Sequence, residues 1–231
     1  MSPAGAACAL GPAGWAGVDP ATGYGMWYKD VKGTNGLPTG ERVTTKVYSE
    51  ASRYYVDKSS LPDVVGGLTN YFKYKNIDLN ILFNFSYGAY VYDSTYASLM
   101  EGFKSPGRAA HQDLQSRWQK AGDVTAIPRV VFGDNVSNGS SMPISDNLEK
   151  GDFIKFRNIA LGYSLPKKLL ESMGLTSFRF YLSAQNAFTI TSYSGFDPEI
   201  SSNGNANGSP SVDRNSAPMA RTFSFGLNLG L

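Results

Sequence analysis

Few residues in this sequence could perform acid–base or metal chemistry. The 231 residues include a single histidine, His111, and a single cysteine, Cys8. One histidine cannot build a multi-histidine metal centre, and one cysteine cannot form an intramolecular disulfide or a multi-cysteine metal site. A Ser/His/Asp triad would have to use His111, for which no partner set is visible. We therefore interpret His111 as a surface polar residue.

Two groups of acidic and amide side chains could suggest other sites. Asp197 and Glu199 could be the paired carboxylates of a glycoside hydrolase, but a proline between them favours a simple turn. Asp134, Asn135 and Asn138 are oxygen-rich, yet their spacing fits no EF-hand loop and is typical of a Gly/Asn turn. The sequence thus predicts no catalytic residue, no resident metal and no cofactor, and we expect the protein not to be an enzyme.

The composition favours a β-rich protein without a nucleic-acid partner. There are 21 Lys and Arg against 19 Asp and Glu, a net charge of +2, so no concentrated basic surface is expected. Charged residues make up only 17% of the chain, whereas aromatic residues reach 13%. No apolar run approaches the ~18–20 residues of a membrane-spanning helix. Membrane-spanning strands remain compatible with this composition, because their apolar and polar residues alternate.

A two-residue period of hydrophobicity is the strongest signal in the chain. In residues 77–92 (IDLNILFNFSYGAYVY), apolar side chains occupy nearly every second position and polar or small ones lie between them. Such alternation predicts a strand with one apolar and one polar face. The segment is longer than the usual strand of about 5–6 residues. It is long enough for a tilted membrane strand, which needs about 9–11 residues.

Five such segments are predicted, and the links between them alternate in length. The predicted strands cover 64–75, 77–92, 153–165, 176–190 and 221–231. The links at 93–152 and 191–220 are long and polar, whereas the others are short, and residues 1–62 have loop chemistry. Long loops on one side and short turns on the other are typical of an outer-membrane barrel. We therefore predict an all-β fold, a partial transmembrane antiparallel β-barrel with long extracellular loops and short periplasmic turns. A soluble sandwich also alternates, but its strands are shorter and its apolar face is internal.

An ordered series of motifs resembles the carboxy-terminal barrel of SusC/RagA-type TonB-dependent outer-membrane transporters. The motifs are FRNIALGYSLP, GLTSFRFYLSAQNAFT, YSGFDPE and the terminal PMARTFSFGLNLGL. Upstream, AGVDPATG, LPDVVGGLTNYFKYKNIDLNILFNFSYG and RWQKAGDVTAIPRV match in the same order. The resemblance covers about residues 15–231, and the ordered series makes it more specific than one short match.

The resemblance implies a role in transport rather than an active site. Transporters of this family import oligosaccharides or peptides through a plugged barrel of about 22 strands, with a SusD-type surface lipoprotein as a lid. The TonB complex supplies energy through the plug, which has no counterpart here. We therefore expect this chain to be the carboxy-terminal portion of a longer protein of the bacterial outer membrane, in contact with its lipid. Residues 1–17 lack the basic region of an export signal, which agrees with this expectation.

Aromatic residues in the predicted loops are the candidates for contact with a substrate or with the lipoprotein. They are Trp27, Tyr28, Trp118, Tyr193 and Phe196. We interpret Trp118 as packing its own loop, with stacking on a sugar ring as the alternative.

Two arginines in the predicted strands have a different expected role. Arg157 and Arg179 are expected to line a polar lumen. The rival hypothesis for the whole chain is a soluble all-β carbohydrate-binding module. Extraction from membranes distinguishes the two hypotheses, because the soluble module stays folded in the aqueous fraction without detergent.

Overall fold

The chain consists of two compact units. The computed structural model describes residues 14–53, 58–100, 107, 109–130, 147–202 and 211–231. The first unit comprises Met1–Leu61, Tyr90–Glu149 and Ile200–Ser216, and the second comprises Pro62–Ala89, Lys150–Glu199 and Ala217–Leu231. The described residues include no helix that is both long and apolar enough to cross a membrane.

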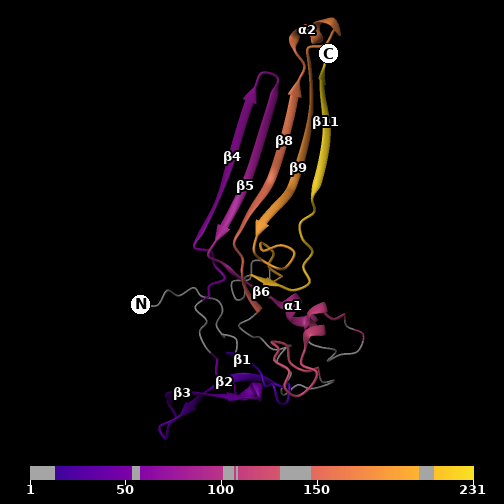
Figure 1. The fold of residues 1–231 in the computed structure, drawn as a ribbon. Coiled ribbons are helices and arrows are strands. Elements are labelled where there is room, and N and C mark those ends of the chain that lie inside the picture. The colour runs from indigo at the N-terminus through magenta and orange to yellow at the C-terminus, as the bar shows by residue number, and fades with distance from the viewer. Residues whose placement is uncertain (1–13, 54–57, 101–106, 108, 131–146, 203–210) are drawn as a thin grey trace. The chain divides into compact units, whose positions relative to one another are not determined.

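The second unit is an antiparallel sheet of five long strands in the order β11-β9-β8-β5-β4 (Figure 1). The strands are β4 (Val64–Tyr74), β5 (Ile77–Tyr87), β8 (Phe153–Ser164), β9 (Ser177–Thr191) and β11 (Thr222–Gly230). A tight turn joins β4 to β5, and the short helix α2 (Lys167–Ser172) lies between β8 and β9. The five-stranded sheet that the alternation predicts is therefore present.

One predicted strand is divided in two. The segment predicted over 77–92 ends as β5 at Tyr87, and a separate strand, β6 (Tyr90–Asp93), follows it. Gly88 lies between them with φ of +91°, a left-handed conformation that interrupts an extended chain. The alternation continues through this break, so hydrophobicity alone does not reveal it.

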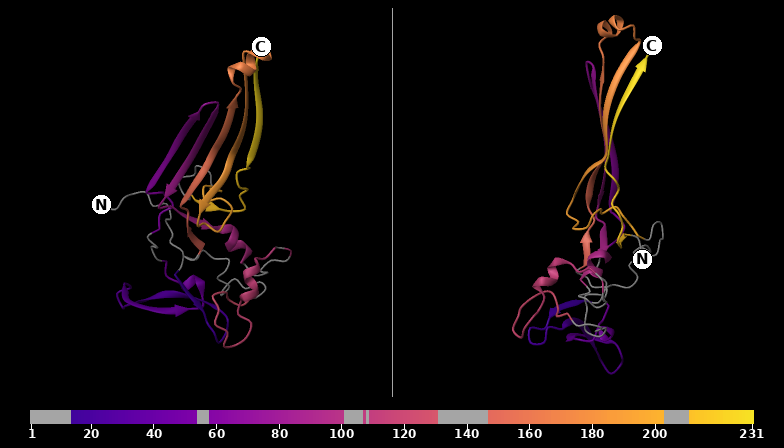
Figure 2. Two further views of the ribbon diagram at one scale, coloured as in Figure 1. Left: turned by 45° about the horizontal axis from the view of Figure 1, so that its top comes forward. Right: turned by 90° about the vertical axis from the view of Figure 1, so that its right-hand side faces the viewer.

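The sheet carries its apolar side chains on one exposed face. Leu79, Leu161, Leu182 and Phe225 are successive partners across β5, β8, β9 and β11. Leu182 is 53% exposed and Phe225 is 68% exposed. The edge-on view in Figure 2 shows a single layer of strands, so the apolar residues form a surface rather than a core.

A bulge in β8 allows that apolar face to extend along the whole sheet. Leu82 pairs with Asn158, but Phe83 pairs with Phe156, which leaves Arg157 as an extra residue. Even-numbered residues of β8 before Arg157 and odd-numbered residues after it therefore point to the same side. Phe156 accordingly stacks on Phe188 with ring centroids 4.2 Å apart and lies 5.7 Å from Phe83.

A charged pair crosses the polar face where one strand carries a glycine. Arg179 on β9 donates to Asp78 on β5, with Nη2 2.6 Å and Nε 3.2 Å from the two carboxylate oxygens. Gly162 on β8 lies between them, and a Cβ there would be 2.6 Å from the nearer carboxylate oxygen of Asp78. The pair therefore depends on the missing side chain. Arg179 lies on the polar face, where the sequence predicts it.

The first unit has two small sheets. Strands β1 (Trp15–Val18), β2 (Gly25–Lys32) and β3 (Pro38–Thr45) form one, and β10 (Val212–Asp213), β6 and β7 (Leu148–Lys150) form the other. The helical segments are η1 (Tyr48–Glu50), α1 (Ser94–Leu99) and η2 (Gln112–Ser116). The prediction that residues 1–62 are mostly loop therefore differs from the structure, in which regular strands occupy much of 15–45.

An aromatic cluster explains why the first of these sheets forms despite its many glycines and prolines. Trp27 on β2 is completely buried. Its ring packs edge-on against Trp15 of β1 at 5.6 Å and against Tyr48 of η1 at 5.4 Å. Three short segments thus share one core, which no local periodicity could reveal.

The Gly162→Ala substitution tests the crossing of the charged pair. The new methyl group is expected to displace Arg179 from Asp78 and to lower the melting temperature of the full-length protein in detergent. In an Asp78→Ala, Arg179→Ala background the same substitution should cost much less, since the space is then free. Equal losses in both backgrounds would contradict the role assigned to Gly162.

Candidate functional site

Two of the five aromatic contact candidates are buried in their own units. Trp27 is fully buried in the aromatic cluster, and Tyr193 is only 6% exposed. Neither ring is available to a substrate or a partner in this conformation, which corrects the expectation for both. Aromatic residues in loop-like sequence were expected to be exposed, whereas these two form small local cores.

The other three candidates keep accessible surface to different extents. Phe196 is 78% exposed and Tyr28 is 39% exposed. Trp118 is half-buried, with its ring over Gly23 and its Nε1 donating to the carbonyl of Pro20 at 2.9 Å. Trp118 therefore packs against the segment around Pro20 and Gly23 rather than within its own predicted loop.

Ionic and cation–π contacts connect the segment near Pro20 to other parts of the first unit. Lys46 donates to Asp19 at 2.5 Å, and this bond, with one from Thr22, lowers the pKa of Asp19 to about 2. The guanidinium of Arg129 lies 4.0 Å from the ring centre of Tyr24 and donates to its hydroxyl at 2.6 Å. These contacts hold the segment 19–24, against which Trp118 packs, in place. They do not create a reactive group.

His111 belongs to a small hydrogen-bonded group with Asp113 and Tyr96. Its Nδ1 accepts from the backbone N–H of Asp113 at 3.3 Å and so caps η2. The hydroxyl of Tyr96 donates to the Asp113 carboxylate at 2.9 Å. Burial and the bond to Asp113 raise the pKa of Tyr96 to about 12, so its hydroxyl stays protonated at neutral pH.

A cluster of four charged side chains stands out in the second unit. Lys155 Nζ lies 2.6 Å from Asp197 Oδ2 and 3.0 Å from Glu199 Oε2. Arg157 donates to the other carboxylate oxygen of Glu199. The side chains of Lys155 and Asp197 are only 3% and 6% exposed. Two cations and two carboxylates thus balance each other, with the Lys155–Asp197 pair buried and the Arg157–Glu199 pair partly exposed.

The bulge in β8 and the turn after β9 bring these four residues together. Lys155 and Arg157 lie on β8 around the bulge, and Asp197 and Glu199 belong to the turn 193–199. The turn is also closed internally, because Asp197 Oδ1 accepts from the backbone N–H of Glu199 at 3.1 Å. The turn predicted from the two acidic residues is present, and both acidic side chains also bind β8, a contact that local sequence does not reveal.

A cleft of about 590 Å³ in the first unit was also not predicted. It lies along β2 and η1, and Lys29, Glu50 and Ser52 are among its lining residues. Lys29 and Glu50 form an ion pair of 2.9 Å at its wall. These groups can offer hydrogen bonds to a ligand, but none of them is arranged as a nucleophile with a base.

The described residues contain no group of three or more His, Cys, Asp and Glu side chains suited to hold a metal ion. Asp134, Asn135 and Asn138, the oxygen-rich group in the sequence, lie outside the described residues.

Comparison with known proteins identifies the relatives of this chain. It is 29% identical over 209 residues to TonB-dependent receptor P3 of Formosa agariphila, a match over 89% of this chain. It is 30% identical over 178 residues to TonB-dependent receptor SusC of Bacteroides thetaiotaomicron, over 76% of this chain. The chain is homologous to SusC/RagA-type TonB-dependent receptors. No family model matches the sequence.

Solved structures agree with this homology. The RagAB peptide importer in its closed-closed state has a TM-score of 0.69 and 25% identity over 95% of this chain. A second structure, described as the RagAB peptide transporter, has a TM-score of 0.70 with 24% identity. The predicted fold class, a partial antiparallel β-barrel, is confirmed. The chain spans only 19% of the length of receptor P3, 16% of SusC and 22% of the closed-closed RagAB chain that it matches.

Breaking the buried pair tests the charged cluster. Lys155→Met should leave the Asp197 carboxylate buried without a cation and cost about 3–5 kcal/mol of local stability. The double variant Lys155→Met, Asp197→Asn should recover a large part of that loss, because no buried charge then remains. The readout is the rate of proteolysis at the turn 193–199 in the folded full-length protein. A loss that the double variant does not reduce would contradict the buried pairing.

Proposed function

We propose that this chain forms barrel wall and outer loops of a TonB-dependent importer in the bacterial outer membrane. The observation that carries the proposal is the exposed apolar face of the five-stranded sheet. Its side chains would be costly in water but are stable against hydrocarbon, at about 25 cal/mol per Å² of apolar surface. The strands have between 9 and 15 residues, which suits a tilted crossing of the bilayer.

The opposite face of the sheet suits a water-filled lumen. It carries Asp78, Arg179 and the cluster around Lys155, all of them charged. Charged groups inside a membrane barrel normally face the lumen or another part of the protein. The expected lumenal position of Arg157 and Arg179 forms part of this proposal.

The partners and the substrate class follow from the resemblance and belong to the proposal. A SusD-type surface lipoprotein would cover the barrel, and the TonB complex would act through a plug elsewhere in the full-length protein. The cargo is an oligosaccharide or a peptide. The structures of RagAB are described as those of a peptide importer, and SusC is a second relative, so similarity supports the transporter class more than either cargo. Among the exposed aromatic residues of the first unit, Tyr28 on β2 is our candidate for contact with the lipoprotein.

The soluble carbohydrate-binding module fits this structure poorly. Such a module would bury its apolar strand face against a second layer. In the described part of the chain many residues of that face are exposed, including Leu182, Phe223 and Phe225. No observation favours this alternative.

Arginine substitutions on the two faces of β9 test the membrane assignment. Leu182→Arg places a cation on the apolar face and is expected to destabilise the barrel by about 2–4 kcal/mol if it lies near the bilayer midplane. The neighbouring Ser183→Arg places the same cation on the polar face and should be tolerated. Heat-modifiable folding of the full-length receptor in outer-membrane fractions is the readout. Equal effects of the two variants, or a receptor absent from these fractions, would refute the proposal.

Growth tests the transport function itself. A strain without the gene should lose growth on one class of polymer in a panel of polysaccharides and a protein digest, each offered as the sole carbon source. The full-length gene should restore that growth. Unchanged growth of the deletion strain on every polymer of the panel would argue against an importing role.

A further inference from the structure

Two short links at one end of the five-stranded sheet are hydrogen-bonded to each other. The backbone carbonyl of Asn76, in the turn between β4 and β5, accepts from the backbone N–H of Ser164 at 2.8 Å. The side-chain amide of Asn76 donates to the Ser164 carbonyl at 2.6 Å. Ser164 ends β8, and α2 begins three residues later, so both links lie at the same end of the sheet (Figure 1). We call residues 74–76 and 165–176 the short-turn rim.

The short-turn rim carries an excess of cations. Lys75, Lys167 and Lys168 belong to it, and all three are exposed. None of them forms an ion pair with a carboxylate of the described residues. Glu171 is the only acidic residue in the rim. Helix stability does not explain the two lysines that begin α2, because cations are favourable in the last turn of a helix and not in the first.

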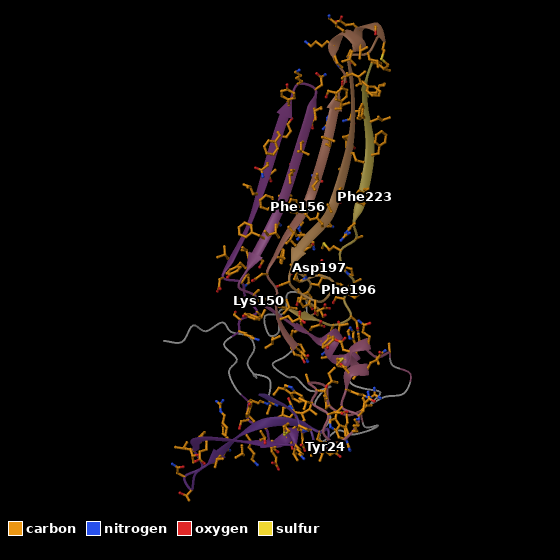
Figure 3. The ribbon with its side chains drawn as sticks, viewed as in Figure 1. Tyr24, Lys150, Phe156, Phe196, Asp197 and Phe223 are labelled. Carbon is orange, nitrogen blue, oxygen red and sulfur yellow. The ribbon has the colours of Figure 1, made fainter. Side chains whose placement is uncertain are left out.

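The opposite end of the sheet pairs its cations within the protein. There Lys155 binds Asp197, and Arg157 binds Glu199. Figure 3 shows Asp197 just beyond the end of β9, at the end of the sheet opposite α2. These cations are already neutralised, whereas the three lysines of the short-turn rim are available to an external anion.

Exposed apolar side chains accompany the lysines of the rim. Lys75 Nζ lies 5.3 Å from the ring centre of Tyr74, which is 71% exposed. Tyr74 pairs with Ile77 and so belongs to the apolar face of the sheet. Leu169 and Met173 are 50% and 56% exposed and, being four residues apart, lie on one side of α2. Lysines beside exposed aromatic and apolar side chains are typical of the headgroup region of a bilayer, where the ammonium meets phosphate and the stem lies against apolar groups.

We propose that the short-turn rim binds an anionic glycerophospholipid. Its phosphate lies among Lys75, Lys167 and Lys168, and the upper part of its acyl chains contacts Tyr74 and Leu169. This inference rests on the proposed function, in which the apolar face lies in lipid and the short turns lie at the periplasmic surface. That face continues into the rim through Tyr74, so the same bilayer reaches both. A zwitterionic headgroup brings its own ammonium group, whereas an anionic one leaves a net charge for the lysines to neutralise.

Quenching of a fluorophore by spin-labelled lipids tests the site. The full-length receptor, with its native cysteines including Cys8 replaced by Ser, carries bimane on Ser172→Cys, on the same side of α2 as Lys168. It is reconstituted into phosphatidylcholine vesicles containing equal fractions of either doxyl-labelled phosphatidylglycerol or doxyl-labelled phosphatidylcholine. The labelled phosphatidylglycerol should quench the bimane several-fold more strongly. On Phe225→Cys, on the apolar face away from the rim, both labelled lipids should quench equally.

Charge variants assign this lipid preference to the lysines. Lys75→Gln, Lys167→Gln and Lys168→Gln together should abolish the preference of the bimane on α2, whereas Glu171→Gln, a neutralisation on the same helix, should keep it. Quenching of bimane on Phe225→Cys, measured in each variant, reports that the barrel is in the bilayer. In the parent receptor, a high salt concentration should weaken the preference without any substitution in the rim, because salt screens exposed charges.

Two results would overturn the inference. One is equal quenching of the bimane on α2 by the two lipids in the parent receptor. The other is a preference that survives the triple lysine variant. Failure of the proposed function has a different signature, because neither lipid would then quench the bimane on Phe225→Cys.

Discussion

A single-layer sheet with one continuous apolar face must be surrounded by something other than water on that face. The second unit has such a sheet, and its two outermost strands, β4 and β11, have one unpaired edge each within the described chain. In the proposed membrane setting both edges require further strands, because unpaired backbone groups are not tolerated in hydrocarbon. The second unit is therefore best explained as part of a larger closed barrel, in agreement with its homology to longer receptors.

The bulge at Arg157 lets the sheet have both a continuous apolar face and the charged cluster on its other side. A strand of strict alternation would place either Phe156 or Leu161 on the wrong face. The extra residue lets both lie on the apolar face, and it places Lys155 and Arg157 beside the turn 193–199. One local irregularity thus serves the apolar face of the sheet and the charged cluster together, as bulges at barrel rims often do.

The long strands could be predicted from the sequence because their signal is local. Alternation in 64–75 or 176–190 is visible within a dozen residues, and homologous motifs reinforce it. The core around Trp27 could not be predicted, because its partners Trp15 and Tyr48 come from separate short segments. For the same reason Trp27 and Tyr193 were expected on the surface. The Lys155–Asp197 pair joins residues 42 positions apart, and only the register of β8 and β9 brings them together.

Glycines on the polar face have a consequence for the bore of the proposed channel. Arg179 lies flat across Gly162 to reach Asp78, and the ring of Tyr181 rests over Gly226. These large polar side chains extend along the sheet surface instead of projecting away from it. In the proposed channel the inner wall would therefore be low in relief over this stretch, and a bulky cargo would meet few projecting side chains there.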